Sequence, residues 1–221
     1  MTLPHTNFRG LTHRRFEFQM LTVLIMMLLF FMGTSLQAQQ WKEEAVADAL
    51  AFQQSLNAEY ADPSQTPLLS EDLKHFNGLG FFPINPDLIF NTTIKRTPQA
   101  VPFMMKRTKD EVKYVKYGEV TFVYEGKSYT LSVYQNLDLM ARNPEYKNHL
   151  FLPFTDATND EATYGGGRYL DLEKSADNQI ILNFNKAYNP LCHYNKKYSC
   201  PIPPAENDLA IPVEAGVKKF H

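Results

Sequence analysis

Apolar and polar residues alternate with a period of two through the middle of the chain. In segment 119–124, Val120 and Phe122 alternate with less apolar neighbours, and segment 129–135 alternates in the same way. The compact turn 125–127 separates the two segments. This pattern predicts a β-hairpin whose two strands pair antiparallel.

Further short strand-like segments recur along the chain, and Gly, Pro and Asn separate them. They lie at 88–94, 101–107, 118–126, 127–135, 149–154, 168–172, 179–185 and 209–214. Many short strands with such turns predict a mainly β domain of the α+β class. We expect an antiparallel sandwich or a partial barrel.

A helical period is confined to the first part of the chain that follows residue 38. In segment 41–62, Ala45, Ala49 and Phe52 recur at helical spacing, and Asp62 with Pro63 ends the pattern. A second, short helix is predicted at 71–76. We expect the N-terminal helix to pack against the sheet.

Residues 1–38 have the layout of a secretory signal peptide. A basic start precedes the apolar run 20–33, and Ala38 offers a small residue before the cut. This predicts an exported protein, periplasmic or extracellular, whose single domain is 39–221 and which has no membrane segment after cleavage. An uncleaved membrane anchor is the alternative, although the run is shorter than the roughly 20 residues that span a bilayer.

Charge argues against nucleic acid as a partner. The chain carries a formal net charge of −2, and the removed segment holds more basic than acidic residues. The mature chain is therefore mildly acidic and has no basic block. The sequence does not predict an oligomeric state.

Both cysteines, Cys192 and Cys200, lie in the exported part of the chain. Two close cysteines in an oxidising compartment predict a disulfide. A loop of this size corresponds to about 2.5 kcal/mol of stabilisation from chain entropy.

The segment TYGGGRYLDL, residues 163–172, is the first candidate site. Its glycines allow positive φ and close approach by another group, and Arg168 can grip a carboxylate or phosphate. A strand pattern follows instead of a helix, which excludes the dinucleotide-binding pattern. The alternative is a sharp bend in which Arg168 pairs with a nearby acid.

Metal and standard catalytic motifs are not found. Asp156, Thr158 and Asp160 alternate as in a calcium loop, but the rest of that pattern fails, so we interpret them as a solvated acidic turn. His193 beside Cys192 suggests a metal or a thiol–imidazole pair only weakly, because sequence neighbours rarely aim at one point. We expect no metal and no cofactor.

An Asn- and Tyr-rich block lies near the C-terminus, at 183–195. Asn and Tyr together offer donors, acceptors and flat apolar faces, which suit sugars and other polar ligands. The alternative is a loop whose amides satisfy its own backbone.

Long segments of the chain resemble the domain-of-unknown-function 1684 family. The resemblance rests on LFLPFTDATNDEATYGGGRYLDL and ILNFNKAYNPLCHYNKKYSCPIPPAENDLAIPVEAG, and it extends from the first helix to Gly216. It implies no established activity. It does imply that the glycine and Asn/Tyr blocks form one unit, a shared site or a structural clasp. The matching residues are Thr163, Tyr164, Gly165, Gly166, Gly167, Arg168, Tyr169, Asp171, Asn185, Tyr188, Asn189, Pro190, Cys192, Cys200, Pro201, Glu206 and Asn207.

Three functions follow as hypotheses. The first is a module that binds a small polar or anionic ligand. The second is a metal-independent hydrolase in which Asp171, Asp156 or Glu206 acts as acid or base and Arg168 binds substrate. The third is a purely structural protein. The candidate ligand-binding residues are Tyr164, Gly165, Gly166, Gly167, Arg168, Asp171, Asn185, Tyr188 and Asn189.

A strand hairpin would bring the glycine block and the Asn/Tyr block together. If strands 168–172 and 179–185 form a hairpin, the glycines at the start of one lie beside 187–189 at the end of the other. We therefore expect one shared site, with Arg168 and Tyr188 within reach of each other.

Overall fold

The computed structural model describes residues 39–221 and, before them, Met26 alone. The chain divides into two units, Met1–Glu44 and Ala45–His221. The predicted signal peptide lies outside the described residues. A helix occupies 39–61, as the helical period predicted. Among the described residues, no helix combines the length and apolar character needed to span a bilayer.

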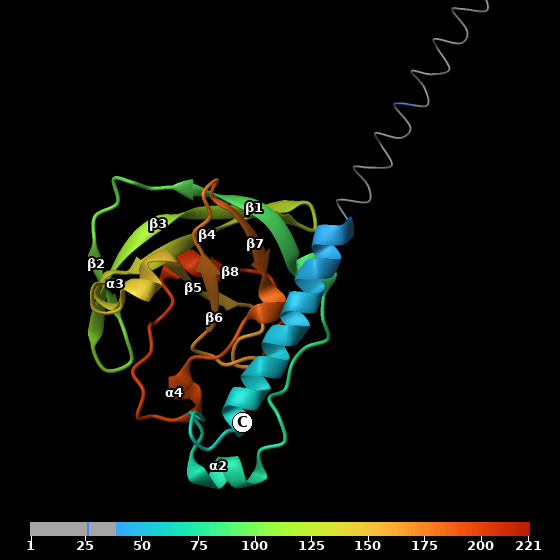
Figure 1. Cartoon of the computed structure of the whole chain (residues 1–221), viewed down its shortest axis with the longest axis vertical. Coiled ribbons are helices and arrows are strands. Elements are labelled where there is room, and N and C mark those ends of the chain that lie inside the picture. The colour runs from blue at the N-terminus through green and yellow to red at the C-terminus, as the bar shows by residue number, and fades with distance from the viewer. Residues whose placement is uncertain (1–25, 27–38) are drawn as a thin grey trace, which may run out of the picture. The chain divides into compact units, whose positions relative to one another are not determined.

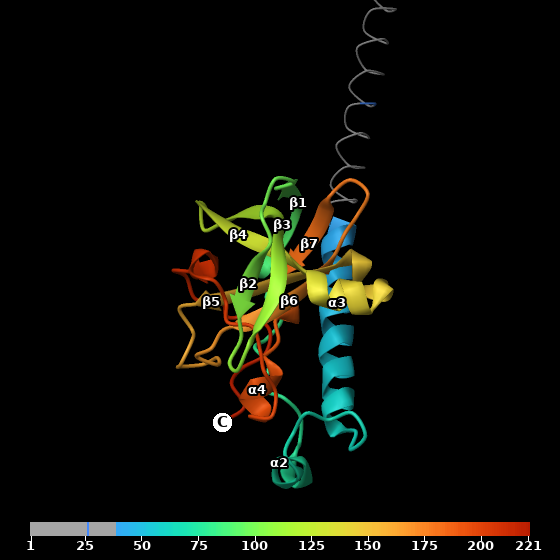
Figure 2. The same ribbon diagram turned by 90° about the vertical axis from the view of Figure 1, so that its left-hand side faces the viewer.

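The larger unit is built on one eight-stranded sheet that is antiparallel except where β8 joins it, and nearly closes into a barrel (Figures 1 and 2). Its strands are β1 Ile89–Arg96, β2 Phe103–Lys106, β3 Glu111–Tyr124, β4 Lys127–Asn136, β5 His149–Asp156, β6 Arg168–Glu173, β7 Gln179–Asn183 and β8 Asp208–Leu209. The order is β6-β5-β4-β3-β1-β7, with β2 on β3 and β8 parallel to β5. The predicted mainly β fold is confirmed.

The predicted hairpin is confirmed as β3 and β4. Phe122 pairs with Tyr129 and Glu119 pairs with Ser132. The turn is tighter than expected, because Lys127 already belongs to β4 and only two residues connect the strands. Positive φ at Glu125 (48°) and Gly126 (74°) gives the backbone twist that a two-residue turn requires.

β3 starts earlier than the sequence pattern suggested. The register shifts between Lys116 and Gly118, which marks a bulge in the strand. Before the bulge, Tyr114 packs outside the barrel core, and after it Val120 packs inside. A bulge adds one residue and reverses the faces, so a simple period of two fails across this stretch.

The barrel interior forms the main core. It consists largely of Leu, Val and Phe side chains from β3 to β7, closed by residues of the C-terminal segment such as Val213 and Ala215. Two smaller apolar clusters lie outside it. One gathers around Tyr169 and Phe151, and the other around Tyr60 and Tyr194.

Short helices fill the connections. They are α2 Ser70–His75, α3 Leu137–Arg142, α4 Leu191–Tyr194, and the 3₁₀ turns η1 Pro86–Leu88, η2 Pro144–Asn148, η3 Phe184–Lys186 and η4 Ala205–Asn207. The predicted strand 209–214 is wrong beyond Leu209. Instead, the segment after β8 runs irregularly and closes one end of the barrel core.

From Ala45 onward, the N-terminal helix packs beside β7 and the turn that follows it (Figure 1). Asn183 Nδ2 donates to the Ala45 carbonyl over 2.8 Å, and Gln53 Nε2 donates to the Asn185 carbonyl over 2.9 Å. The Phe52 ring lies 6.4 Å from the Tyr188 ring. These contacts fix the helix against the Asn/Tyr block.

Candidate functional site

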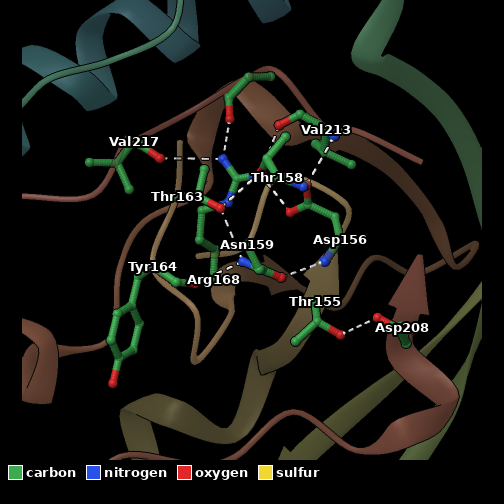
Figure 3. Close-up of polar contacts among 11 residues, drawn as sticks. Thr155, Asp156, Thr158, Asn159, Thr163, Tyr164, Arg168, Asp208, Val213 and Val217 are labelled. Atoms are coloured by element: carbon green, nitrogen blue, oxygen red, sulfur yellow. Dashed lines mark hydrogen bonds and ion pairs between the residues drawn. The ribbon is translucent and has the colours of Figure 1, made fainter. Parts of the chain in front are cut away.

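Arg168 is the most deeply buried charged residue of the glycine block. Its guanidinium donates to Asp156 Oδ2 and to the Val213 carbonyl, each over 2.8 Å, and also to the carbonyls of Ala215 and Val217 (Figure 3). The side chains of Arg168 and Asp156 are both 0% exposed. Burial lowers the pKa of Arg168, and the charge of Asp156 opposes that shift. Arg168 therefore acts as a clasp that holds the C-terminal segment over the end of the barrel.

The acidic turn 156–160 is not the solvated turn that the sequence suggested. Asp156 Oδ1 accepts from the Thr158 main-chain N–H and hydroxyl and from the Val213 N–H. Asp156 and Thr158 are both buried. The carboxylate is fully used in holding the turn, the tail and Arg168, which removes Asp156 as a free acid or base.

Three other predicted site residues are also structural. Asn185 pairs with the backbone of Asn85, accepting over 2.7 Å and donating over 2.9 Å. Asn189 donates to the Lys218 carbonyl over 2.9 Å. Gly167 has φ +84°, and a Cβ there would lie 2.5 Å from the Phe154 carbonyl oxygen. All three positions are buried and serve the packing of the barrel end.

A cavity of about 550 Å³ lies between the N-terminal helix, the outer face of the sheet and the segment around α4. We call it the tyrosine pocket. Its lining is Phe52, Leu56, Glu59, Tyr60, Tyr114, Leu139, Tyr146, His149, Phe151, Tyr169, Asp171, Tyr188, Pro190, Leu191, Ser199, Cys200 and Pro201. Neither Lys nor Arg contributes to it. The volume falls within the usual range for small-ligand sites, roughly 300–1,000 Å³.

A polar cluster of three side chains lies on the wall of the tyrosine pocket. Asp171 Oδ1 lies 2.8 Å from His149 Nε2, and the Tyr188 hydroxyl donates to Asp171 Oδ2 over 2.7 Å. The same three residues also line an adjoining cavity of about 380 Å³. The Asp171 side chain is 49% exposed, so its remaining lone pairs can accept hydrogen bonds from a ligand.

Three buried tyrosine hydroxyls of this pocket, those of Tyr114, Tyr169 and Tyr188, stay protonated at neutral pH. Burial raises the pKa of Tyr114 to about 12. Burial also raises the pKa of Tyr169 and Tyr188, and the Asp171 carboxylate adds to the shift at Tyr188. The pocket thus presents neutral aromatic rings beside one carboxylate–imidazole pair.

Strand register explains how these residues meet. Phe151 on β5 pairs with Asp171 on β6, and His149 lies two residues further along the same face. Tyr169 and Tyr188 exchange two main-chain hydrogen bonds of 2.9 and 3.0 Å. The two sequence blocks therefore do meet, as expected.

The isolated bridge between Tyr169 and Tyr188 joins the two blocks. The expected hairpin between β6 and β7 is wrong, because β6 pairs with β5 and β7 pairs with β1. Side chains alternate along β6, so Arg168 packs at the barrel end while Tyr169 and Asp171 face outward. The charge of Arg168 and the polar cluster lie on opposite faces of one strand.

The remaining glycine-block residues line a different cavity of about 460 Å³, which we call the glycine-loop pocket. Its lining is Asp160, Thr163, Tyr164, Gly165, Gly166, His193, Lys219 and His221. The rings of Tyr164 and His193 lie 4.4 Å apart. Figure 3 shows the Tyr164 side chain pointing away from the guanidinium of Arg168. The predicted single site is thus divided between two cavities.

Glu206, the second catalytic candidate, lies elsewhere again. It accepts a hydrogen bond of 2.7 Å from the Tyr134 hydroxyl, and it lines none of the three cavities described above. Its neighbour Asn207 is fully buried and joins β4 to β5 through Ser132 and Pro153. Within the described part of the chain, no group of three or more His, Cys, Asp or Glu could hold a metal ion.

The two cysteines lie side by side as free thiols. The Cys192 main-chain N–H donates to Cys200 Sγ over 3.0 Å. Cys200 lines the tyrosine pocket. The sulfur atoms are therefore close neighbours, and the predicted disulfide stays a prediction.

Several pocket residues had no signal in the sequence analysis. His149, Tyr114 and Phe151 lie in strands that were recognised only as strands or not at all. Their shared face follows from the β5–β6 register and from the bulge in β3, neither of which the sequence pattern reveals. Tyr114 could have been placed on the outer face of the sheet only if the length of β3 and the position of its bulge had been known.

Comparison with known proteins identifies the family of this chain and a similar solved structure. A family described as "Protein of unknown function (DUF1684)" matches residues 74–218. The chain belongs to the DUF1684 family. The match begins after the N-terminal helix, so it covers less of the chain than the resemblance suggested. No curated protein matches the chain.

A chain of known structure is also similar. The solution NMR structure of an uncharacterized protein from Haloarcula marismortui matches with a TM-score of 0.62 and 28% sequence identity. The match covers 82% of this chain and 96% of the other. The barrel with its N-terminal helix is therefore shared beyond this protein, while the comparison assigns no activity.

Proposed function

We propose that this protein binds a small ligand in the tyrosine pocket, and that the ligand is neutral or cationic with a flat or apolar face. The observation that carries the proposal is the cavity of about 550 Å³ with five tyrosines on its wall and Asp171 held by His149 and Tyr188. Aromatic rings bind flat apolar surfaces, and a carboxylate accepts from hydroxyl or ammonium groups.

The charge of the lining selects against anions. Glu59 and Asp171 are the carboxylates on the wall, and His149 already faces Asp171. The one arginine assigned to ligand binding, Arg168, is buried in the clasp. A ligand with a carboxylate or phosphate would meet the charges of Glu59 and Asp171, and neither Lys nor Arg lines the tyrosine pocket to offset them.

The clasp also bears on the two alternatives. A hydrolase that holds its substrate through Arg168 lacks support, because the Arg168 side chain is 0% exposed and its guanidinium is hydrogen-bonded to Asp156 and to main-chain carbonyls. A structural role fits Arg168, Asn185 and Asn189. It does not account for the open pocket next to them.

Export belongs to the same proposal. The signal-peptide pattern of residues 1–38 supports a mature protein that works outside the cytoplasm. The proximity of Cys192 and Cys200 supports a disulfide there. Neither feature is needed for the pocket itself.

Three probes with one aromatic ring and different head groups test the binding proposal. Phenyl β-glucoside and tyramine should raise the thermal midpoint of the chain 39–221, since a ligand that binds only the folded state stabilises it. Phenyl phosphate should not. If phenyl phosphate alone stabilises the protein, the proposed charge preference is wrong, and if none of the three does, the pocket proposal fails.

A further inference from the structure

Cys192 and Cys200 lie next to each other at the edge of the tyrosine pocket. Cys200 lies on the wall of the tyrosine pocket, and it is 6% exposed. Cys192 is partly buried and is the second residue of α4, which begins at Leu191. The sulfur of Cys200 accepts from the Cys192 main-chain N–H over 3.0 Å. Cys200 therefore lines a cavity, while Cys192 contacts its sulfur and lies outside that lining.

The surroundings of Cys200 stabilise its thiolate. The guanidinium of Arg107 lies next to it, since Arg107 Nε donates to the carbonyl of the preceding residue, Ser199, over 3.0 Å. The Cys192 thiol, the Cys192 main-chain N–H and the charge of Arg107 lower the pKa of Cys200 to about 7, against the effect of burial. The same hydrogen bond from its thiol raises the pKa of Cys192.

We propose that Cys200 and Cys192 form a thiol–disulfide exchange site that opens into the tyrosine pocket, with small organic disulfides that carry an aromatic or other flat group as its substrate class. This inference rests on the proposed ligand pocket. Cys200 is the attacking thiolate, because it lines the cavity. Cys192 is the resolving thiol, because its sulfur lies beside Cys200 and outside the cavity lining.

The chemistry balances within the dithiol and its substrate. The Cys200 thiolate attacks one sulfur of the substrate disulfide, the substrate S–S bond breaks, and one half leaves as a thiolate. Cys192 gives its proton to that thiolate or to water and attacks the Cys200 sulfur, which releases the second half. The protein dithiol is oxidised to a disulfide, and the substrate disulfide is reduced to two thiols.

4,4′-Dithiodipyridine, an aromatic disulfide, tests the proposal on the reduced chain 39–221. The wild-type protein should release two equivalents of pyridinethione and keep no adduct. Its rate should rise with pH through a midpoint near 7, the pKa of Cys200. Cys192→Ser should keep the fast first step and stop at a mixed disulfide that intact mass detects. Cys200→Ser should react more slowly, by ~3–10-fold at pH 7, because its remaining thiol is less ionised.

Several results would overturn the proposal. A rate midpoint above pH 8 excludes a stabilised thiolate, and equal rates for the two variants exclude the assigned order. A wild-type protein whose folded thiols do not react, or whose disulfide resists millimolar glutathione, has only a structural bridge. Matching far-ultraviolet spectra and thermal midpoints of the three reduced proteins exclude misfolding as the cause.

A variant outside the pocket lining separates this inference from the pocket proposal. In Cys192→Ser, phenyl β-glucoside and tyramine should still bind, because Cys192 does not line the tyrosine pocket. Retained probe binding together with a failed exchange assay in the wild type would overturn the exchange site alone. Lost probe binding in both wild type and Cys192→Ser would remove the pocket.

Discussion

At the scale of single residues, Arg168 illustrates how one sequence motif can be read in two ways. An arginine after three glycines suits an anion site, but here its two terminal guanidinium nitrogens donate to Asp156 and to three carbonyls of the C-terminal segment. Two buried charges that satisfy each other tolerate no loss of a partner. The role of Arg168 is therefore testable through stability.

Arg168→Met should destabilise the protein by about 3–5 kcal/mol, because it leaves the Asp156 carboxylate buried without its cation. Urea unfolding measures the change. Lys74→Ala is the control, since the Lys74–Glu71 pair is exposed and should contribute no more than ~1 kcal/mol. A loss at Arg168 as small as at the control would show that the clasp does not hold the fold.

His193 provides a second test at this scale. Its Nε2 accepts from the Phe220 N–H over 2.9 Å, which requires an unprotonated nitrogen. Burial, with the charges of His221 and Lys219, lowers the pKa of His193 from its ordinary 6.5 to about 4. Between these values the unfolded chain binds more protons, so stability contributed by His193 is present above pH 6.5 and is lost as pH falls to 4.

His193→Gln should therefore flatten the decline of unfolding free energy between pH 6.5 and 4, relative to wild type. His75→Gln is the matched control, because the His75 side chain is 81% exposed. Urea unfolding at several pH values gives both curves. Parallel curves for His193→Gln and wild type would contradict the assignment.

At the scale of elements, the barrel end depends on a backbone shape that only glycine adopts easily. Gly167 precedes β6 with φ +84°, and an added Cβ would lie 2.5 Å from the Phe154 carbonyl and 2.8 Å from Pro203 Cγ. Gly126, in the β3–β4 turn, has φ +74° with nothing within 4 Å of the added Cβ. Comparing substitutions at Gly126 and Gly167 therefore separates the free-energy cost of a left-handed backbone from the cost of steric overlap.

Gly126→Ala should cost ~1–2 kcal/mol, the cost of left-handed backbone for a residue with a Cβ. Gly167→Ala should cost more, about 2–5 kcal/mol, because steric overlap adds to the same strain. Denaturant unfolding of both variants measures the difference. Equal losses at the two positions would show that the barrel end adapts freely.

The sequence pattern predicted elements better than it predicted their partners. The β3–β4 hairpin and the N-terminal helix follow from local periodicity, and both are confirmed. Contacts made across the sheet do not follow from it. The pairing of Phe151 with Asp171 depends on the register between β5 and β6. The burial of Arg168 depends on the irregular C-terminal segment around Val213. Periodicity carries no information on either.

At the scale of the whole molecule, one strand separates the Arg168 clasp from the tyrosine pocket. β6 turns Arg168 toward the closed barrel end and Asp171 toward the tyrosine pocket. The family match includes both faces, as it spans residues 74–218. A fixed clasp on one face thus positions a pocket wall on the other.

The mature protein should begin near Gln39. Intact mass of material recovered from the culture medium or periplasm of an expressing bacterium gives the start directly. The mass expected is that of residues 39–221, less two hydrogen atoms if the disulfide has formed. A mass that retains residues 20–33 would mean that the N-terminal segment is a membrane anchor.

The central claim is that the tyrosine pocket binds ligand while Arg168 does not. Titration of ¹⁵N-labelled 39–221 with phenyl β-glucoside and with tyramine, followed by amide chemical shifts, tests it most directly. Leu191→Trp adds bulk on the pocket wall, and Ile202→Trp is its control, an exposed apolar residue outside the lining. We predict saturable shifts around Asp171 and Tyr188 that Leu191→Trp abolishes and Ile202→Trp retains. Shifts centred on Arg168 and the C-terminal tail, or none at the pocket with either probe, would contradict the account.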